Sequence, residues 1–554
     1  MKEGFRQSMA WLHTWSGLLG GWVLFLVFCA GTACYFKDEI SFWMRPELHQ
    51  ASLAVPAPPE SAAVAMAAMQ ERAPTSKRWF ITLPSAREPG VRATWERPPA
   101  PKAAKGEPGG EKPVARRNRF ENATLDPNTG KPLLAARETR GGEFLYRLHF
   151  DLHYMPAIWA RWIVGFCAMF MLVAIVSGII THKRIFKDFF TFRPKKGQRS
   201  WLDAHNVTAV VALPYHLMIT YTGLVTLMFM YMPWGQQAVY KADQDAFNAE
   251  VFASSSPRDA KAAGVAAPLA PIGPMVEQAM AHWNGAPVGR ITVNHPNDAN
   301  ATVSLLRQGG HDMSSLQPSM LFNGVTGARV STAGDSAGPA VQTRGVLYGL
   351  HTAHFGNPLL RGLFFLSGLA GCVMVATGLV MWAVKERQKY AKVLAHGGRT
   401  GWGLRLVEGL NLGAIAGVPL AMAVYFWANR LLPLGIAERS QAEITAFFAA
   451  LGLAMVLGLA RPTRRMWQLV LALGGALFAA VPLLNAATTA THLGVSLTTG
   501  LWVVAGFDLV CLLLGAALLA SAAWLGRKQA AKAPARKATA ATTDNRSMPE
   551  GAVS

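Results

Sequence analysis

Long apolar stretches recur along the chain and are separated by short polar segments. A helix that crosses a bilayer needs about 20 mostly apolar residues. Charge-free runs at or near that length cover residues 7–36, 162–181, 204–240, 362–384, 409–429, 444–460, 466–507 and 509–526. The seventh run is too long for one span, and the polar stretch Asn485–His492 interrupts it. We expect one helix to end near Leu484 and the next to begin near Val495 and continue through Asp508. The pattern predicts an integral membrane α-helical bundle of about eight transmembrane helices.

The first apolar run follows Lys2 and Arg6, as the apolar part of a secretory signal peptide would. The run is too long for a signal peptide, and no convincing cleavage site follows it. We therefore expect a retained signal anchor.

Basic residues gather on one side of the predicted membrane. Residues 1–14, 183–200, 385–405, 461–465 and 527–554 hold 24 of the 53 Lys and Arg residues but only 5 of the 32 Asp and Glu residues. Because Lys and Arg mark cytoplasmic loops, we expect a multi-pass membrane protein with both termini in the cytoplasm. The net charge of +21, which alone suggests nucleic acid or an anionic membrane surface, is then mainly a topology signal. We expect the protein to have the lipid bilayer as a partner and to bind no nucleic acid.

Two long segments, residues 38–147 and 236–343, then lie outside the membrane, and each is long enough for a small domain. Alternating apolar and polar positions predict short strands in both segments, at 79–83, 91–95, 289–293 and 301–306. The Pro/Ala/Lys/Gly-rich stretch 98–119 predicts a flexible basic insertion in the first segment. We expect two small α+β periplasmic domains.

These expectations divide the chain into ten consecutive segments. They are transmembrane helix 1 (1–37), periplasmic domain 1 (38–147), helix 2 (148–183), a basic cytoplasmic loop (184–203), helix 3 (204–235), periplasmic domain 2 (236–343), helix 4 (344–384), a cytoplasmic loop (385–404), a C-terminal four-helix transmembrane extension (405–526) and a disordered basic cytoplasmic tail (527–554).

The first four spans look like an internal duplication. Shifts of about 192 to 201 residues match His13 with His205, Gly31 with Gly223, Arg161 with Arg361, Gly178 with Gly378 and His153 with His354. The turn sequence at Asp126–Lys131 likewise corresponds to the one at Asn323–Ala328. Each unit therefore consists of a helix, an external domain and a second helix.

Histidines lie in two layers of the predicted bundle. The layer at the cytoplasmic helix ends contains His13, His182 and His205, the layer at the external entrances contains His149, His153, His351 and His354, and His216 lies inside the third span. Eleven residues separate His205 from His216, about 16 Å along a helix, so both face the same side.

Histidine is a common haem ligand, and ionisable residues inside a membrane are usually functional. Two His layers could hold two b-type haems and carry electrons across the bilayer. Nearby glycines, such as Gly178, Gly223 and Gly378, would let a flat macrocycle approach the backbone. Two alternatives stay open: the histidines could be interfacial anchors, or the four external ones could converge on Zn or Cu.

Several motifs resemble the PepSY-associated transmembrane family of bacterial inner-membrane proteins. The matching stretches are Leu12–Leu18, the sequence LHFDLHYMP at 148–156, Ser177–Lys183, His205–Leu224 and Leu350–Leu369, with DPNTG in the first external domain. The resemblance covers about residues 1–390, and the last four helices lie outside the core pattern. It implies an iron-regulated inner-membrane protein similar to ferric-siderophore reductases that carry two b-type haems.

The resemblance also implies haem ligands among the layered histidines. For the cytoplasmic haem the first choice is His13 with His205, and His182 is a reserve. For the external haem the first choice is His153 with His354. The competitors for the external haem are His216, His149 and His351.

The resulting hypothesis is a dihaem reductase that passes electrons from the cytoplasmic side to periplasmic ferric-siderophore and releases Fe(II) for uptake. One alternative is a non-enzymatic protein whose PepSY modules bind or regulate an envelope partner such as a peptidase. Another is a component of an iron or siderophore transporter. The carboxylate of Asp508 inside a predicted span suggests this role, because intramembrane carboxylates often handle protons or ions. That carboxylate could equally be a hydrogen-bonded partner of Thr or Asn on a neighbouring helix.

Overall fold

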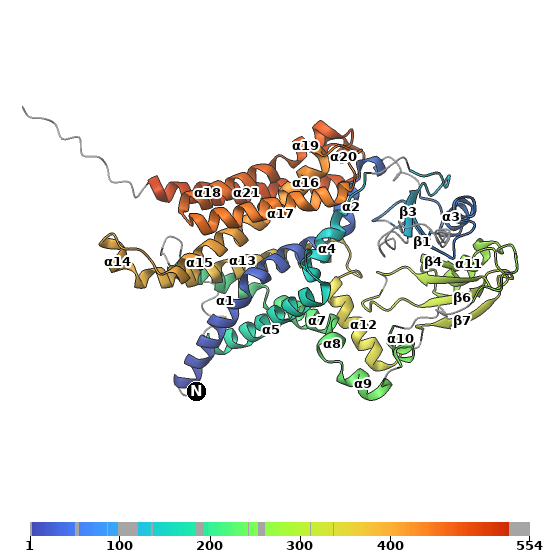
Figure 1. The fold of residues 1–554 in the computed structure, drawn as a ribbon, viewed down its shortest axis with the longest axis horizontal. Helices are drawn as coiled ribbons and strands as arrows, with labels where there is room; N and C mark the ends of the chain where they lie inside the picture. The colour runs from blue at the N-terminus through green and yellow to red at the C-terminus, as the bar shows by residue number, and fades with distance from the viewer. Residues whose placement is uncertain are drawn as a thin grey trace, which may run out of the picture.

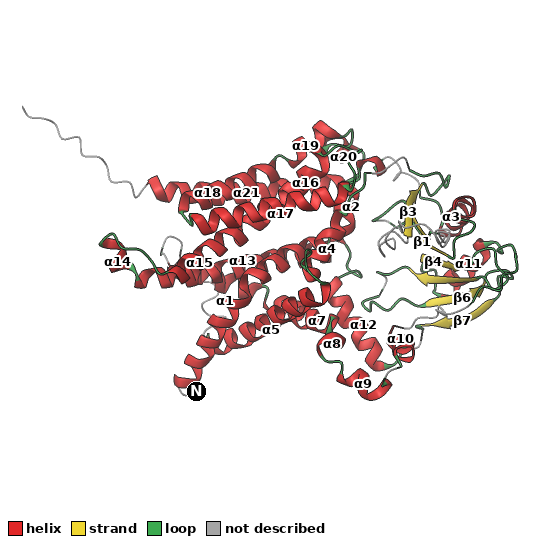
Figure 2. Cartoon of the chain, viewed as in Figure 1, coloured by secondary structure: helices red, strands yellow, loops and turns green. Residues whose placement is uncertain are grey.

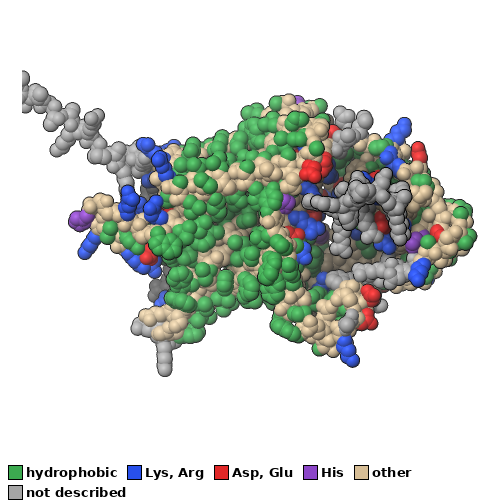
Figure 3. Space-filling model, viewed as in Figure 1, with side chains coloured by type: hydrophobic (Ala, Val, Ile, Leu, Met, Phe, Trp, Pro, Cys, Tyr) green, Lys and Arg blue, Asp and Glu red, His purple; other side chains and the backbone are tan. Residues whose placement is uncertain are grey.

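The computed structural model describes residues 3–49, 55–85, 87–97, 120–133, 137–182, 193, 196, 198–241, 243–252, 261–310, 312–335 and 337–530. The predicted insertion at 98–119 and the tail beyond residue 530 lie outside the described residues. A bundle of long helices carries a β-sheet domain at one end, which we call the sheet end (Figure 1). Lys and Arg side chains gather at the opposite end, which we call the basic end (Figure 3).

The long helices form the bundle. They are α1 (Glu3–Cys34), α5 (Ala157–Thr181), α6 (Gln198–Val211), α7 (Leu213–Thr226), α13 (Pro358–Lys389), α15 (Trp402–Asn411), the π-helical turn Leu412–Ala416, α16 (Gly417–Leu431), α17 (Arg439–Ala460), α18 (Arg464–Ala479), α19 (Val481–Thr488) and α21 (Trp502–Ala530). Among the described residues, six helices are long and apolar enough to cross a membrane, and eight if each of two bent helix pairs counts as one span. The protein is therefore a multi-pass membrane protein.

Prolines break two of the predicted spans. The pair α6 and α7 is bent by 70°, and Pro214 lies in the first turn of α7. The pair α18 and α19 is bent by 42°, and Pro482 lies in the first turn of α19. Proline lacks the amide hydrogen and its ring clashes with the preceding turn, so a helix kinks or ends there. The third span is thus two helices rather than the continuous one that its apolar run predicts.

Shorter helices complete the fold, and most of them lie at the sheet end, whereas α14 lies at the basic end (Figure 2). They are α2 (Lys37–Trp43), the 3-10 turn Pro46–Leu48, α3 (Pro58–Arg72), α4 (Gly141–Asp151), α8 (Met228–Tyr231), α9 (Trp234–Tyr240), α10 (Gln244–Phe252), α11 (Ile272–His282), α12 (Pro339–Thr352), α14 (Ala391–Ala395) and α20 (Leu493–Thr498).

Both of the segments that were predicted to lie outside the membrane, 38–147 and 236–343, contribute strands to one antiparallel sheet of order β3-β2-β1-β4-β5-β6-β7. The strands are β1 (Arg78–Thr82), β2 (Val91–Glu96), β3 (Phe120–Leu125), β4 (Val288–Asn294), β5 (Thr302–Arg307), β6 (Ser319–Asn323) and β7 (Arg329–Ala333). The two segments therefore do not stand apart as two separate domains, because β1 pairs with β4, where Ile81 lies opposite Ile291.

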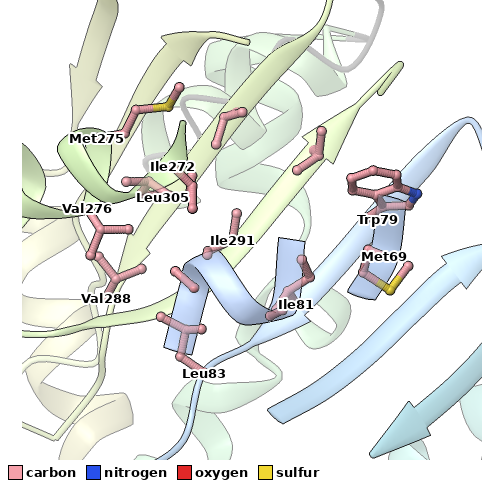
Figure 4. Close-up of a cluster of buried hydrophobic side chains, with 14 of the residues drawn as sticks. Met69, Trp79, Ile81, Leu83, Ile272, Met275, Val276, Val288, Ile291 and Leu305 are labelled. Atoms are coloured by element: carbon pink, nitrogen blue, oxygen red, sulfur yellow. The ribbon is translucent and has the colours of Figure 1, made fainter. Parts of the chain in front are cut away.

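One face of the sheet forms an apolar core with α3 and α11. The buried side chains include Trp79, Ile81, Ile291 and Leu305 from the strands and Met69 from α3 (Figure 4). They alternate with exposed or half-buried residues because successive strand residues point to opposite faces. Alternation in the sequence predicted these strands correctly, whereas the register between β1 and β4 joins residues that lie far apart in the chain.

Asp508 is fully buried in a polar network between the C-terminal helices and α2. The indole nitrogen of Trp43 donates to its Oδ1 at 2.9 Å, and the amide of Asn485 donates to its Oδ2 at 2.9 Å. Arg430 donates to Asn485 at 3.0 Å, and its guanidinium lies 4.0 Å from the centre of the Trp43 ring. These bonds give Asp508 the structural role of holding α2 against the C-terminal helices.

Candidate cofactor sites

Two histidines face each other between the helices of the basic end. His13 lies on α1 and His205 on α6, and the centres of their rings are 6.2 Å apart. Nδ1 of His13 lies 2.8 Å from the carbonyl oxygen of Ala174, and Nδ1 of His205 lies 2.8 Å from that of Met374. A carbonyl only accepts, so both Nδ1 atoms carry the proton. Each Nε2 is then the unprotonated nitrogen that a metal ion requires.

A second pair lies at the sheet end. His149 on α4 and His351 on α12 have ring centres 6.0 Å apart. Nδ1 of His149 donates to the carbonyl of Val27 at 2.8 Å. Nδ1 of His351 lies 3.1 Å from the hydroxyl of Thr222, which itself donates to a carbonyl and so accepts from the ring. Both Nε2 atoms are again unprotonated.

A glycine on a neighbouring helix makes room for each of the four rings. A Cβ at Gly178 would lie 3.1 Å from Cε1 of His13, and a Cβ at Gly378 would lie 3.2 Å from Cε1 of His205. The corresponding distances are 2.6 Å from Gly31 to His149 and 3.1 Å from Gly223 to His351. These glycines thus seat the imidazoles. For Gly178, Gly223 and Gly378 the sequence also predicts the close approach of a flat macrocycle, which stays a prediction.

A cavity adjoins each pair. The cavity at the basic end has a volume of about 840 Å³ and is lined by His13, His205, His182 and His216. The cavity at the sheet end has a volume of about 380 Å³, and His149, His351 and His354 line it.

The geometry of both pairs fits a shared iron ion. A metal–imidazole bond is about 2.0–2.1 Å long, so two rings on opposite sides of one ion have their centres roughly 6.4 Å apart. The observed separations of 6.2 and 6.0 Å are close to this value. Within the described part of the chain, no three His, Cys, Asp or Glu side chains converge as a metal site. Haem supplies four nitrogen ligands itself, so two histidines suffice for it, whereas Zn or Cu needs more protein ligands.

The sequence-based first choice for the external pair, His153 with His354, is not the pair that the structure brings together. α4 ends at Asp151, and Leu152 and His153 adopt left-handed conformations with φ of 51° and 63°. The chain therefore turns before His153 could follow His149 on the same helix face. The His153 ring stacks on Phe448 instead, with 18° between the ring planes. His354 lines the cavity without facing a second imidazole among the described rings.

The two remaining candidates lie beside the first pair. Nε2 of His182 is 3.1 Å from the side-chain amide nitrogen of Asn206. His216 is buried, with its ring edge-on to Phe28, whose side chain lines the cavity at the sheet end. His216 therefore lies between the two pairs rather than within either.

Charged side chains line the cavity at the sheet end, namely Lys37, Arg147 and Arg161. The sequence analysis named Arg161 but neither Lys37 nor Arg147. Asp151 pairs with Arg161 at 2.8 Å and with Arg147 at 3.2 Å. Only the match of Arg161 with Arg361 in the internal repeat drew attention to one of them.

The family model described as the PepSY-associated TM region matches residues 10–385. The match covers more than half of the chain, so the chain belongs to this family, and it includes all four paired histidines. None of the curated proteins matches the chain.

Proposed function

We propose that this member of the PepSY-associated TM family is a dihaem membrane reductase that transfers electrons across the bilayer to periplasmic ferric-siderophore. The observation that carries the proposal is the presence of two imidazole pairs, one at each end of the bundle, with ring separations of 6.2 and 6.0 Å. The enrichment of Lys and Arg at the basic end supports placing that end and both termini in the cytoplasm of a bacterial inner membrane.

Four side chains would hold two b-type haems, which supply one-electron carriers when bound. His13 and His205 would hold one haem, and His149 and His351 the other. Their Nδ1 bonds hold the rings in place and leave each Nε2 to bind the iron, so little reorganisation would accompany a change of charge. The buried ring of His216 and the half-buried ring of Phe28, which it contacts edge-on, lie between the pairs and limit the access of water to the path.

Lys37, Arg147 and Arg161 would shape the approach to the external haem, since they line its cavity. A substrate at this opening gains an electron, and its Fe(III) becomes Fe(II). Siderophores bind Fe(II) weakly, so reduction releases the metal for uptake.

The same proposal includes a duplicated origin for the first four spans with two PepSY-like modules. Each external segment consists of a helix followed by antiparallel strands, α3 with β1 to β3 and α11 with β4 to β7. Each contains a turn in which an Asp or Asn side chain, Asp126 or Asn323, accepts two backbone amides. A glycine with positive φ follows in both turns, Gly130 at 67° and Gly327 at 73°.

The decisive experiment is an optical spectrum of the purified protein before and after dithionite reduction, with the ratio of haem to protein. A b-type spectrum and a ratio of two are expected. A protein without haem would overturn the proposal. A second measurement, reduction of ferric siderophore outside vesicles that contain the protein and an internal reductant, tests the direction of transfer.

A second candidate is a module that binds or regulates an envelope partner such as a peptidase. The edge strand β7 favours it, because four of its five residues are exposed and its outer edge could pair with another strand. A variant with both His13→Ala and His205→Ala that kept its full haem content would favour this alternative. The role as an iron or siderophore transporter component depended on Asp508, whose hydrogen bonds to Trp43 and Asn485 give it a structural use.

A further inference from the structure

The two cavities differ in size although equivalent histidine pairs face them. The cavity at the basic end, about 840 Å³, is more than twice as large as the one at the sheet end, about 380 Å³. If both hold the same macrocycle, the larger cavity has space for a second molecule. The difference between the two cavity volumes is itself comparable to the volume of an ordinary small-molecule site, which typically measures about 300–1,000 Å³.

The larger cavity opens sideways, toward lipid. Trp11 and Trp15 of α1 and Leu202 of α6 line it, with exposed fractions of 63%, 40% and 41%. α1 is a membrane-spanning helix, and such exposed apolar side chains face acyl chains rather than water. Trp is typical of the level where headgroups meet the bilayer core. A lipid-soluble molecule could therefore enter between these helices without passing through the aqueous phase.

A polar pair lies inside this apolar cavity. His182 and Asn206 both line it, and the Asn206 amide nitrogen is 3.1 Å from Nε2 of His182. Nδ1 of His182 is buried and has no hydrogen-bond partner among the described residues. A buried nitrogen without a partner calls for an explanation, and a hydroxyl group of a bound ligand would supply the missing bond.

We propose that a membrane hydroquinone binds in this cavity, with a ring hydroxyl on Nδ1 of His182, and acts as the electron donor. The inference rests on the proposed dihaem function. The aromatic ring lies near Trp11 and Trp15, and the isoprenoid tail leaves through the lateral opening.

The reaction balances with the hydroquinone as a two-electron reductant. The hydroquinone loses two electrons and two protons and becomes the quinone. His13 and His205 would hold the haem that would accept these electrons one at a time. The protons leave toward the basic end of the cavity, where Lys385, Glu386 and Lys389 line its mouth.

A soluble nicotinamide or flavin donor fits the opening less well. Its phosphates need charged partners, whereas Trp11, Trp15 and Leu202 offer none. Of the two lysines that line the aqueous end of the cavity, Lys389 pairs with Glu386 at 2.7 Å, which leaves the exposed Lys385 to meet a phosphate. The soluble donor is nevertheless one outcome of the test.

The test uses the full chain in lipid nanodiscs, decylubiquinol as reductant and rapid-mixing spectroscopy of the haem bands. The variant His182→Leu removes the proposed hydroxyl partner. His396→Leu is the matched control, because His396 is exposed and lies outside the cavity. We expect decylubiquinol to reduce the wild type and the control at equal rates and His182→Leu at least tenfold more slowly. The dithionite spectrum should be the same in all three.

Reduction by dithionite or NADH but not by decylubiquinol would overturn the inference while leaving the dihaem function intact. Equal rates for His182→Leu and wild type would also overturn it. A photoreactive azidoquinone provides a readout that does not depend on haem. Labelling of peptides from α1, α5 or α6 that decylubiquinone prevents would support the site even if the protein held no haem, and labelling elsewhere would contradict it.

Discussion

The ring of His149 lies directly against Gly31, so closely that a Cβ on this glycine would be 2.6 Å from Cε1 and 2.7 Å from Nδ1. Nδ1 also donates to the carbonyl of Val27, one turn earlier on the same helix. α1 therefore both seats and orients the imidazole on α4. Because the contact is so close, the addition of a single methyl group at residue 31 tests the site that contains His149.

The variant Gly31→Ala should lose the external haem and keep the other. Real Cβ contacts are essentially never shorter than 3.0 Å, so the His149 ring must move and its bond to Val27 must break. We expect the ratio of haem to protein to fall from two to one. Gly4→Ala is the control on the same helix, because its Cβ would meet nothing within 4 Å and Gly4 lines neither cavity. A ratio of two in both variants would contradict the role of Gly31.

His149→Ala and His153→Ala should behave differently. His149→Ala removes a proposed axial ligand and is expected to leave one haem per chain. His153→Ala loses only the stacking on Phe448 and should retain two. The haem-to-protein ratio and the reduced spectrum distinguish them. If His153→Ala held one haem and His149→Ala held two, the result would favour the pairing of His153 with His354 that the sequence analysis preferred.

Asp508→Ala should destabilise the protein by about 3–5 kcal/mol, the typical cost of breaking a buried charged network. The change leaves the Trp43 indole without its acceptor and Asn485 with the Thr491 carbonyl at 3.3 Å as its acceptor, and it removes one of the two carboxylates, with Glu47, that compensate the charge of Arg430. Asp508→Asn keeps the shape and should cost less. The control is Asp245→Ala, because Asp245 is exposed. Thermal unfolding in detergent measures the effect, and equal midpoints for Asp508→Ala and Asp245→Ala would refute it.

Stability should fall as the pH drops from about 6.5 to about 4 because of His49. Burial lowers the pKa of His49 to about 4, and its ring nitrogens bond Thr491 at 2.5 Å and the carbonyl of Phe42 at 3.0 Å. Unfolded histidine has a pKa near about 6.5, so in this window the unfolded chain binds a proton that the folded one does not. The loss can reach about 3 kcal/mol.

The measurement for His49 is the unfolding midpoint as a function of pH. His49→Gln, which does not titrate, should flatten the curve between pH 4 and 6.5, although it lowers stability at neutral pH. An unchanged slope in this variant would assign the pH dependence to other groups.

Part of the candidate site could be predicted from the sequence. His13 and His205 were correctly placed in one layer, because their positions follow from the spans that carry them. The external pair was not predictable in the same way. His149 and His153 are four residues apart, which puts both on one face of a continuous helix, and only the end of α4 at Asp151 separates them. His351 and His354 are similarly divided by Ala353, which has a φ of 51°.

The sequence by itself determined where the apolar runs lie, how the charges are distributed between them and how apolar and polar residues alternate in the strands. These features are local, since a bilayer requires about 20 apolar residues in a row and a strand repeats every two residues. The tertiary structure decided which histidines face each other, how β1 and β4 join two distant segments into one sheet, and that Asp508 is held by Trp43 and Asn485. Each of these depends on helix rotation, on the bend before Pro214 or on contacts between residues hundreds of positions apart, and a pattern along the chain contains none of that information.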